Sequence, residues 1–175
     1  MAESVPEVEE YLQGEERKPR ALDDRVLREP ISVLKPAAPV CVERGSMVSE
    51  AVRQMQEHRI GCVLVTDGGR LAGIFTERDV LRDLVGKRLD PEVTPIDELM
   101  TPDPETLSLS AGIMFALNKM SLGGFRHVPL VDESHHPVGI VSVKDIVDYI
   151  VDFFPEVLNV PPEPGLDVAR AREGA

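Results

Sequence analysis

Gly73-Ile-Phe-Thr-Glu-Arg-Asp79 occurs a second time along the chain, as Gly139-Ile-Val-Ser-Val-Lys-Asp145, 66 residues later. The segments before these two stretches also match. Met55 and Met120 each end an apolar-periodic run, at a spacing of 65 residues. A repeat of this period indicates one supersecondary unit that is built twice.

The spacing is 66 again where Val63–Val65 aligns with Pro129–Val131. We therefore expect the second copy to carry its one extra residue in the loop 121–126. Each copy has the pattern of a strand, a helix, a hairpin and a second helix. The elements are expected at 40–42, 49–57, 62–65, 71–75 and 77–85 in the first copy, and at 106–109, 111–120, 128–131, 138–141 and 143–154 in the second.

A β-α-β-β-α unit of about 55–60 residues is too small to bury its apolar face alone, so two copies are expected to pack together. The sequence thus predicts an α+β fold of two tandem β-α-β-β-α repeats. We place the first repeat at 30–90 and the second at 91–154. Residues 1–29 form an N-terminal extension, in which 22–28 is a candidate lead-in helix, and 155–175 form a C-terminal tail.

Composition narrows the class of protein. Apolar residues make up 42% of the 175 residues, aromatic residues only 4%, and there is no Trp, so the core is expected to be aliphatic. The formal net charge of −12 argues against nucleic acid or an anionic membrane as a partner. The N-terminus lacks the apolar run of a signal peptide, and no stretch approaches the roughly 20 apolar residues of a membrane span.

Two cysteines, Cys41 and Cys62, lie in apolar stretches and form no CxxC pair. We interpret them as reduced core thiols in a cytoplasmic protein. Histidines could suggest a metal site, but His135 and His136 are adjacent in an expected turn, and His58 is placed at a helix end. No metal site, cofactor or catalytic set of side chains is expected.

The motifs Thr76-x-x-Asp79 and Ser142-x-x-Asp145 carry the chemistry. Each has the form of a capping box, in which a hydroxyl and an acid cap the start of a helix. However, Arg78 and Lys144 precede the acids, and a cation in the first turn opposes the helix dipole. The cation becomes favourable if an anion binds at that helix N-terminus.

An aspartate can accept hydrogen bonds from two adjacent hydroxyls, such as those of a ribose. The nearby cation suits a phosphate, and apolar strand residues could enclose a flat base. These features together favour a nucleotide, whereas the capping reading alone leaves a scaffold without a ligand.

At this point the two motifs, at the ends of two β-α-β-β-α repeats, resemble paired cystathionine-β-synthase (CBS) domains, the Bateman module. Asp97–Pro104 is similar to the usual lead into a second such repeat, and Phe125–Asp132 to its second strand. The resemblance covers roughly Pro30 to Phe154. It implies two clefts between the repeats, related by pseudo-twofold symmetry, that bind AMP, ADP, ATP, S-adenosylmethionine or a related adenosine ligand.

Roles follow from the resemblance for several residues. It implies that Asp79 and Asp145 hold ribose hydroxyls, and that Thr76 and Ser142 contact ribose or phosphate. Basic side chains would lie near phosphate. The basic set is Arg78, Arg126, His127 and Lys144, and the remaining ligand-binding candidates are Cys41, Ile60, Gly61, Cys62, Val128 and Pro129.

The first repeat has Gly61-Cys62 where the second has Arg126-His127. The two clefts are therefore expected to differ, and the one served by Arg126 and His127 is expected to suit phosphate better. The resemblance implies a regulatory module without catalysis, acting on a separate and unknown effector protein. A homodimer is expected, partly because the last helix is more apolar than one buried face requires. The alternative is a ligand-free structural or dimerisation scaffold.

Overall fold

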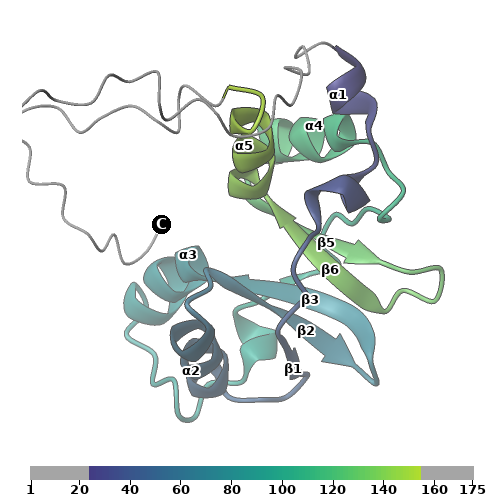
Figure 1. Cartoon of the computed structure of the whole chain (residues 1–175). Helices are drawn as coiled ribbons and strands as arrows, with labels where there is room; N and C mark the ends of the chain where they lie inside the picture. The colour runs from purple at the N-terminus through teal and green to yellow at the C-terminus, as the bar shows by residue number, and fades with distance from the viewer. Residues whose placement is uncertain (1–23, 155–175) are drawn as a thin grey trace, which may run out of the picture.

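The computed structural model describes residues 24–154, which form two units whose β-hairpins face each other (Figure 1). The N-terminal part contains α1 (Asp24–Arg28), η2 (Ile31–Leu34), β1 (Cys41–Glu43), α2 (Val48–His58), β2 (Cys62–Asp67), β3 (Arg70–Thr76), α3 (Glu77–Asp79) and η3 (Val80–Val85). The C-terminal part contains η4 (Ile96–Glu98), β4 (Thr101–Pro102), α4 (Ile113–Gly123), β5 (His127–Val131), β6 (Pro137–Ser142) and α5 (Val143–Val151).

The strands form two sheets. A four-stranded sheet has the order β1-β2-β3-β4, in which β1 is parallel to β2 and the other pairs are antiparallel. The second sheet is the antiparallel hairpin β5–β6. The structure confirms the α+β fold of two β-α-β-β-α repeats. The candidate lead-in helix is present as α1, although residues 22 and 23 lie outside the described part of the chain.

Both first helices bury the same stripe. In α2 the buried positions are Val48, Ala51 and Met55, and α4 buries Ile113, Ala116 and Met120 at the same helical spacing. The residues after the two helices, Arg59 and Gly124, have φ of 53° and 66°, which is the left-handed conformation of a helix C-cap. The two repeats are therefore still offset by 65 residues at the ends of these helices.

The extra residue of the second repeat does not lie in the loop 121–126, so that prediction was wrong. Cys62 pairs with Thr76 and His127 pairs with Ser142, which shows that β5 is still offset by 65 from β2. The extra residue lies in the β5–β6 turn. There the Asp132 carboxylate accepts hydrogen bonds from the N–H groups of Ser134 and His136, at 2.9 and 2.8 Å, and stabilises the longer turn.

The strand expected at 106–109 is reduced to a single parallel bridge between Leu107 and Leu130. Leu107 donates its N–H to Pro129 and accepts from Val131. The chain then turns, because the N–H of Ala111 bonds to the carbonyl of Ser108 at 3.1 Å. A strand here would need further ladder hydrogen bonds, which the turn prevents.

The second helices also depart from the expected bounds. Residues 77–85 begin as the single α-helical turn α3 and continue as the π-helix η3. After η3 the chain forms a Schellman cap, in which Arg88 has φ of 55° and the N–H groups of Arg88 and Leu89 donate to the carbonyls of Val85 and Leu84, at 3.1 and 2.9 Å. The helix α5 ends at Val151 rather than at 154.

The two cores exchange connecting segments. Ile96 and Leu99 fall within the bounds of the second repeat but pack in the first core, with Val63 and Phe75. Conversely, Ile31 falls within the bounds of the first repeat but packs in the second core. A third cluster joins the hairpins, and its members are Cys62, Leu64, Leu71 and Ile74, against Val131 and Ile140. The repeat bounds 30–90 and 91–154 thus remain a proposal, because packing crosses them.

Gly73 offers a test of this packing. A Cβ at Gly73 would lie 2.5 Å from Sδ of Met100 and 3.0 Å from the carbonyl oxygen of Thr101. We expect Gly73→Ala to lower the free energy of unfolding by about 1–3 kcal/mol, as overpacking does. Urea unfolding monitored by circular dichroism measures the change.

The control is Gly139→Ala, at the matching position of the second repeat. Its Cβ would meet the flexible end of Leu130 at 3.2 Å and the Ala37 carbonyl at 3.6 Å, so a smaller loss is expected. Equal losses for the two variants would contradict the view that β4 packs tightly on β3.

Candidate functional site

The two strand-to-helix junctions have the same hydrogen-bonded cap. At the β3–α3 junction, Oδ2 of Asp79 accepts from the backbone N–H and the hydroxyl of Thr76, at 2.9 and 2.8 Å. At the β6–α5 junction, Oδ2 of Asp145 accepts from the N–H and hydroxyl of Ser142, at 2.7 and 2.8 Å. Both are capping boxes, so the structure confirms the capping reading of the two motifs.

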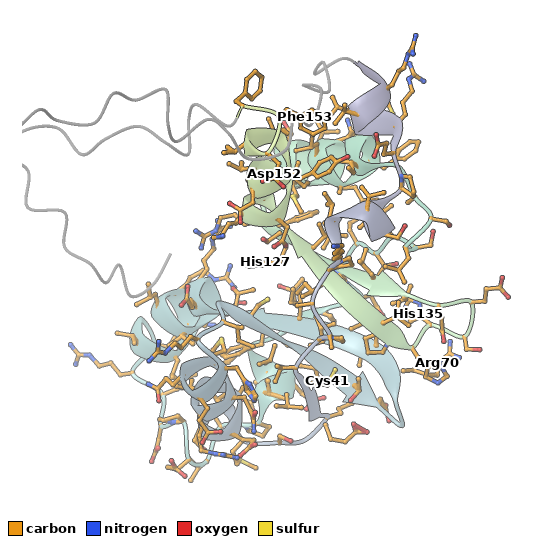
Figure 2. All side chains as sticks on the ribbon, viewed as in Figure 1. Cys41, Arg70, His127, His135, Asp152 and Phe153 are labelled. Atoms are coloured by element: carbon orange, nitrogen blue, oxygen red, sulfur yellow. The ribbon has the colours of Figure 1, made fainter. Side chains whose placement is uncertain are left out.

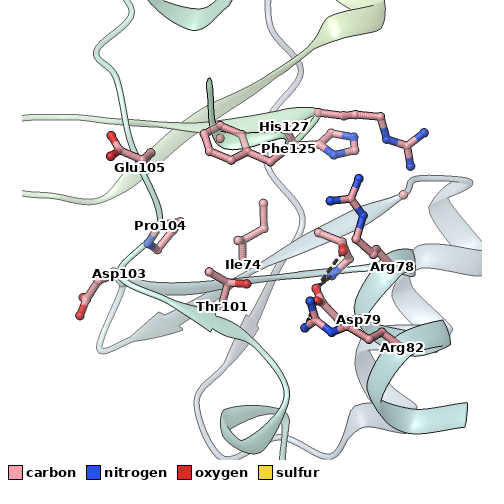
Figure 3. Close-up of a pocket in the computed structure, with 14 residues that line it drawn as sticks. Ile74, Arg78, Asp79, Arg82, Thr101, Asp103, Pro104, Glu105, Phe125 and His127 are labelled. Atoms are coloured by element: carbon pink, nitrogen blue, oxygen red, sulfur yellow. Dashed lines mark hydrogen bonds and ion pairs between the residues drawn. The ribbon is translucent and has the colours of Figure 1, made fainter. Parts of the chain in front are cut away.

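The first junction opens into a cavity of about 370 Å³ (Figure 3). Pockets of about 300–1,000 Å³ hold small-molecule ligands. Six of the residues predicted from sequence line it: Gly61, Thr76, Arg78, Asp79, Arg126 and His127. The first four come from the first repeat and the last two from the second. The cavity therefore lies between the repeats.

Two cations of this cavity have no carboxylate partner. Arg78 donates from Nη1 to the carbonyl oxygen of Gly124 at 3.0 Å, which links the two repeats. Arg126 is exposed, and its guanidinium group makes no hydrogen bond or ion pair with any described residue. Two unneutralised guanidinium groups in a chain with net charge −12 create a local site for an anion.

Sequence reasoning missed eight lining residues: Ile74, Arg82, Thr101, Asp103, Pro104, Glu105, Gly123 and Phe125. Thr101 reaches the cavity because β4 pairs with β3, where Ile74 faces Thr101. That long-range pairing leaves no local sequence signal. Asp103 and Glu105 lie at one end of the cavity and Arg78 at the other (Figure 3), so the lining is electrostatically polarised.

The other sequence-predicted residues do not line this cavity. Ser142 and Asp145 form the second junction, where Lys144 is exposed and its ammonium pairs with the Asp148 carboxylate. That pairing raises the pKa of Lys144. The cavity does not test the predicted ligand contacts of Ser142, Lys144 and Asp145, which remain a prediction.

Most of the apolar residues predicted to bind the ligand pack within the fold instead of lining the cavity. Val128 and Pro129 are buried in β5, and Ile60 packs against the first core. Burial, with a smaller effect of Glu77, raises the pKa of Cys62 to about 12, so this thiol is inert. Cys41 is exposed rather than a core thiol, because β1 presents only Val42 to the core.

Histidines form no metal site in the described part of the chain. Within residues 24–154, no group of three or more His, Cys, Asp or Glu side chains converges in a way that could hold an ion. His135 and His136 lie in the β5–β6 turn, where His135 has φ of 66°. His58 is the last residue of α2. None of the helices in this part is long and apolar enough to cross a bilayer.

His127 is the histidine that lines the cavity, at the boundary between the repeats. Its pairing with Ser142 in β6 places it beside the second junction as well as in the cavity. Burial lowers the pKa of His127, and the charge of Arg126 lowers it further, whereas Asp145 and Glu77 act in the opposite direction. In the absence of an anion, the imidazole is therefore held in its neutral form at neutral pH.

Several known proteins are similar in sequence to this chain. The family model for the CBS domain matches residues 33–86 and 96–152. An uncharacterized 17.7 kDa protein from Acidianus ambivalens is 31% identical over 123 residues, covering 70% of this chain and 73% of that one. The Arabidopsis thaliana protein CBSCBSPB3 is 36% identical over 99 residues, or 57% of this chain, which spans only 18% of that relative.

Solved structures share the fold. The CBS domain pair of protein MJ0100, in complex with 5-methylthioadenosine and S-adenosylmethionine, has a TM-score of 0.61 at 25% identity, covering 69% of this chain and 98% of that one. A CBS domain protein from Pyrobaculum aerophilum, complexed with AMP, has a TM-score of 0.64 at 24% identity, covering 72% and 98%.

The lowered pKa of His127 generates a pH prediction. The unfolded chain, with a histidine pKa of about 6.5, binds the proton more readily than the folded chain, so folding is penalised as pH falls through and below about 6.5. We expect His127→Gln to lose stability less steeply than wild type between about pH 7.5 and 5.5. Urea unfolding at a series of pH values measures this slope.

His58→Gln, at the exposed end of α2, controls for the substitution itself. Parallel pH profiles for wild type and His127→Gln would refute the assignment of this slope to the buried imidazole.

Proposed function

The chain belongs to the CBS domain family, and we propose that it is a regulatory module that binds an adenine nucleotide between its repeats. The observation that carries the proposal is the composition of the cavity. Asp79 supplies a carboxylate suited to ribose hydroxyls, and Arg78 and Arg126 supply cations without carboxylate partners. A single small ligand that carries a sugar and an anionic group can bind the carboxylate through its sugar and the two cations through its anionic group.

The ligand class follows from the charges at this end of the cavity. A phosphate near Arg78, Arg126 and His127 would form charge-assisted hydrogen bonds and would favour the protonated imidazole. Ile74 and Phe125 offer apolar surface for a base. These features support AMP, ADP or ATP in this cavity. The complex of MJ0100 with adenosine-derived ligands supports the adenosine part.

The second cleft remains part of the proposal. Ser142, Lys144 and Asp145 repeat the motif at the β6–α5 junction, but the positions that match Arg126 and His127 are Gly61 and Cys62. Gly61 lines the first cavity, and at the second junction the ammonium of Lys144 is already paired with the Asp148 carboxylate. The second cleft therefore offers less free charge for phosphate than the cavity that contains Arg78 and Arg126. S-adenosylmethionine or a related adenosine ligand suits it better than a nucleoside phosphate.

We place the module in the cytoplasm and assign it no catalysis of its own. Its ligand would instead bias the module toward one conformation, which a separate effector protein recognises. The alternative function is a ligand-free scaffold. The observation that favours the alternative is that the capping boxes satisfy both motifs internally, without any ligand.

Arg126 gives the sharpest test of the proposed ligand. We expect Arg126→Ala to weaken AMP binding by about tenfold, because it removes a charge-assisted hydrogen bond to the phosphate. Adenosine lacks the phosphate, so its affinity is expected to stay unchanged. Isothermal titration calorimetry with both ligands measures the difference.

The matched control is Arg70→Ala, which removes the same charge at the far end of the β2–β3 hairpin from His127 (Figure 2). It is expected to bind AMP as wild type does. Equal AMP affinity in wild type and Arg126→Ala would contradict the phosphate site, and absence of binding to wild type would favour the scaffold.

A homodimer is the proposed assembly. Helices α4 and α5 pack side by side, and they expose apolar side chains: Phe115 and Leu122 are 55% and 81% exposed on α4, and Val147 is 49% exposed on α5. Exposed apolar side chains on two neighbouring helices favour association with a second copy. Sedimentation equilibrium at tens of micromolar is expected to give twice the chain mass. A monomer at that concentration would overturn the assignment.

A further inference from the structure

Arg82, one turn beyond Asp79 on η3, lines the cavity and holds two carboxylates at once. Its Nη2 lies 3.0 Å from Oδ1 of Asp79 and 2.6 Å from Oδ2 of Asp83, and its Nε donates to the same Asp83 oxygen at 2.8 Å. Figure 3 shows Arg82 beside Asp79 at the cavity wall. The Arg82 side chain is 61% exposed, whereas the Asp79 side chain is 5% exposed.

The hydrogen bonds of Asp79 leave little room for a ligand. A carboxylate offers about four acceptor places on its two oxygens. Thr76 takes two places on Oδ2, with its backbone N–H and its hydroxyl, and Arg82 takes one on Oδ1. One place is left. The two adjacent hydroxyls of a ribose need two, so full engagement of Asp79 requires Arg82 to release Oδ1.

The second repeat lacks this contact. The residue 66 positions beyond Arg82 is Asp148, an acid, which pairs with Lys144. Among the described residues, Oδ1 of Asp145 accepts no hydrogen bond, although Oδ2 has the same two donors as in the first repeat. The Asp145 carboxylate therefore keeps two acceptor places open, and the difference between the two junctions comes from Arg82.

We propose that Arg82 competes with the ribose hydroxyls for Asp79 and so lowers the affinity of the first-repeat cleft for any nucleoside. The inference rests on the proposed function, because it assumes that Asp79 receives ribose. Arg82 does not have to leave the site to release Asp79. Its Nε contact to Asp83 can persist, and Lys87 gives Asp83 a second cation, at 2.9 Å from Oδ1.

The test compares Arg82→Met with Lys87→Met. Both variants remove one cation from Asp83, but only Arg82 contacts Asp79. Adenosine is the main probe because it carries the ribose and no charge, and AMP is the second probe. Amide chemical shifts of Gly61 and Thr76, which line this cavity, restrict the NMR titration to the first-repeat cleft.

We expect Arg82→Met to bind adenosine about two- to fivefold more tightly than wild type, the effect of removing one solvent-exposed ion pair. Lys87→Met is expected to match wild type. Unchanged or weaker adenosine binding in Arg82→Met would overturn the inference. So would weaker AMP binding with unchanged adenosine binding, because that pattern makes Arg82 a phosphate ligand.

Wild type alone provides a second readout if Arg82→Met does not fold. Raising the salt concentration from about 0.1 M to about 1 M shortens the screening length from about 10 Å to about 3 Å and weakens the ion pair of Arg82 with Asp79. Adenosine affinity is then expected to rise, and a constant or falling affinity would overturn the inference. If wild type binds neither ligand, the proposed function itself fails. If it binds but Arg82 has no effect, only the present inference fails.

Discussion

The apolar surface shared by the two hairpins is the contact on which the rest of the structure depends. Leu64 is fully buried, and Leu71 and Ile74 nearly so, in a cluster that continues onto Val131 and Ile140 of the other repeat. Neither repeat of this size can bury such a surface alone. The exchange of Ile31 and Ile96 between the two cores links the repeats further. The cavity exists because this packing brings the β3–α3 junction of one repeat against β5 of the other.

The same residues stabilise the helix start and present chemistry to the cavity. The backbone N–H and hydroxyl of Thr76 bond to the Asp79 carboxylate, which fixes both side chains at the cavity wall. A ligand bound there would meet a group that is already ordered, so little conformational entropy is lost on binding. The cost is that capping and binding use the same acceptor oxygens. For this reason, the loss of Asp79 would affect both the fold and the site.

Much of the fold could be predicted from the sequence because its signals are local. The repeated Gly-Ile motif, the apolar stripes of α2 and α4 and the two hairpins all show within short windows. The position of the extra residue could not be predicted in this way. By composition, Val63–Val65 matches the apolar segment Pro129–Val131 at a spacing of 66 as well as the apolar segment Val128–Leu130 at a spacing of 65. Only the pairing of Cys62 with Thr76 and of His127 with Ser142 shows that the β5–β6 turn holds it.

The candidate site was predictable only in part, because some of its residues are brought in by pairing between distant segments of the chain. Thr76, Asp79, Arg126 and His127 belong to recognisable motifs, whereas Thr101 and Asp103 reach the cavity through the pairing of β4 with β3. Arg82 gave no signal, since an arginine at i+3 from an aspartate is a common surface pair on a helix. Cys41 was misplaced as a core thiol because a three-residue strand exposes every second side chain.

An NMR titration of the wild-type chain with AMP tests the central claim, that the cavity between the repeats holds an adenine nucleotide, most directly. The account predicts saturable shifts at the amides that line it, Gly61, Thr76, Asp79 and Arg126. It also predicts a gain of about 2.7 kcal/mol in stability at one hundred times the dissociation constant. No saturable shift at any of these amides with AMP in the millimolar range, in a chain that remains folded, would contradict it.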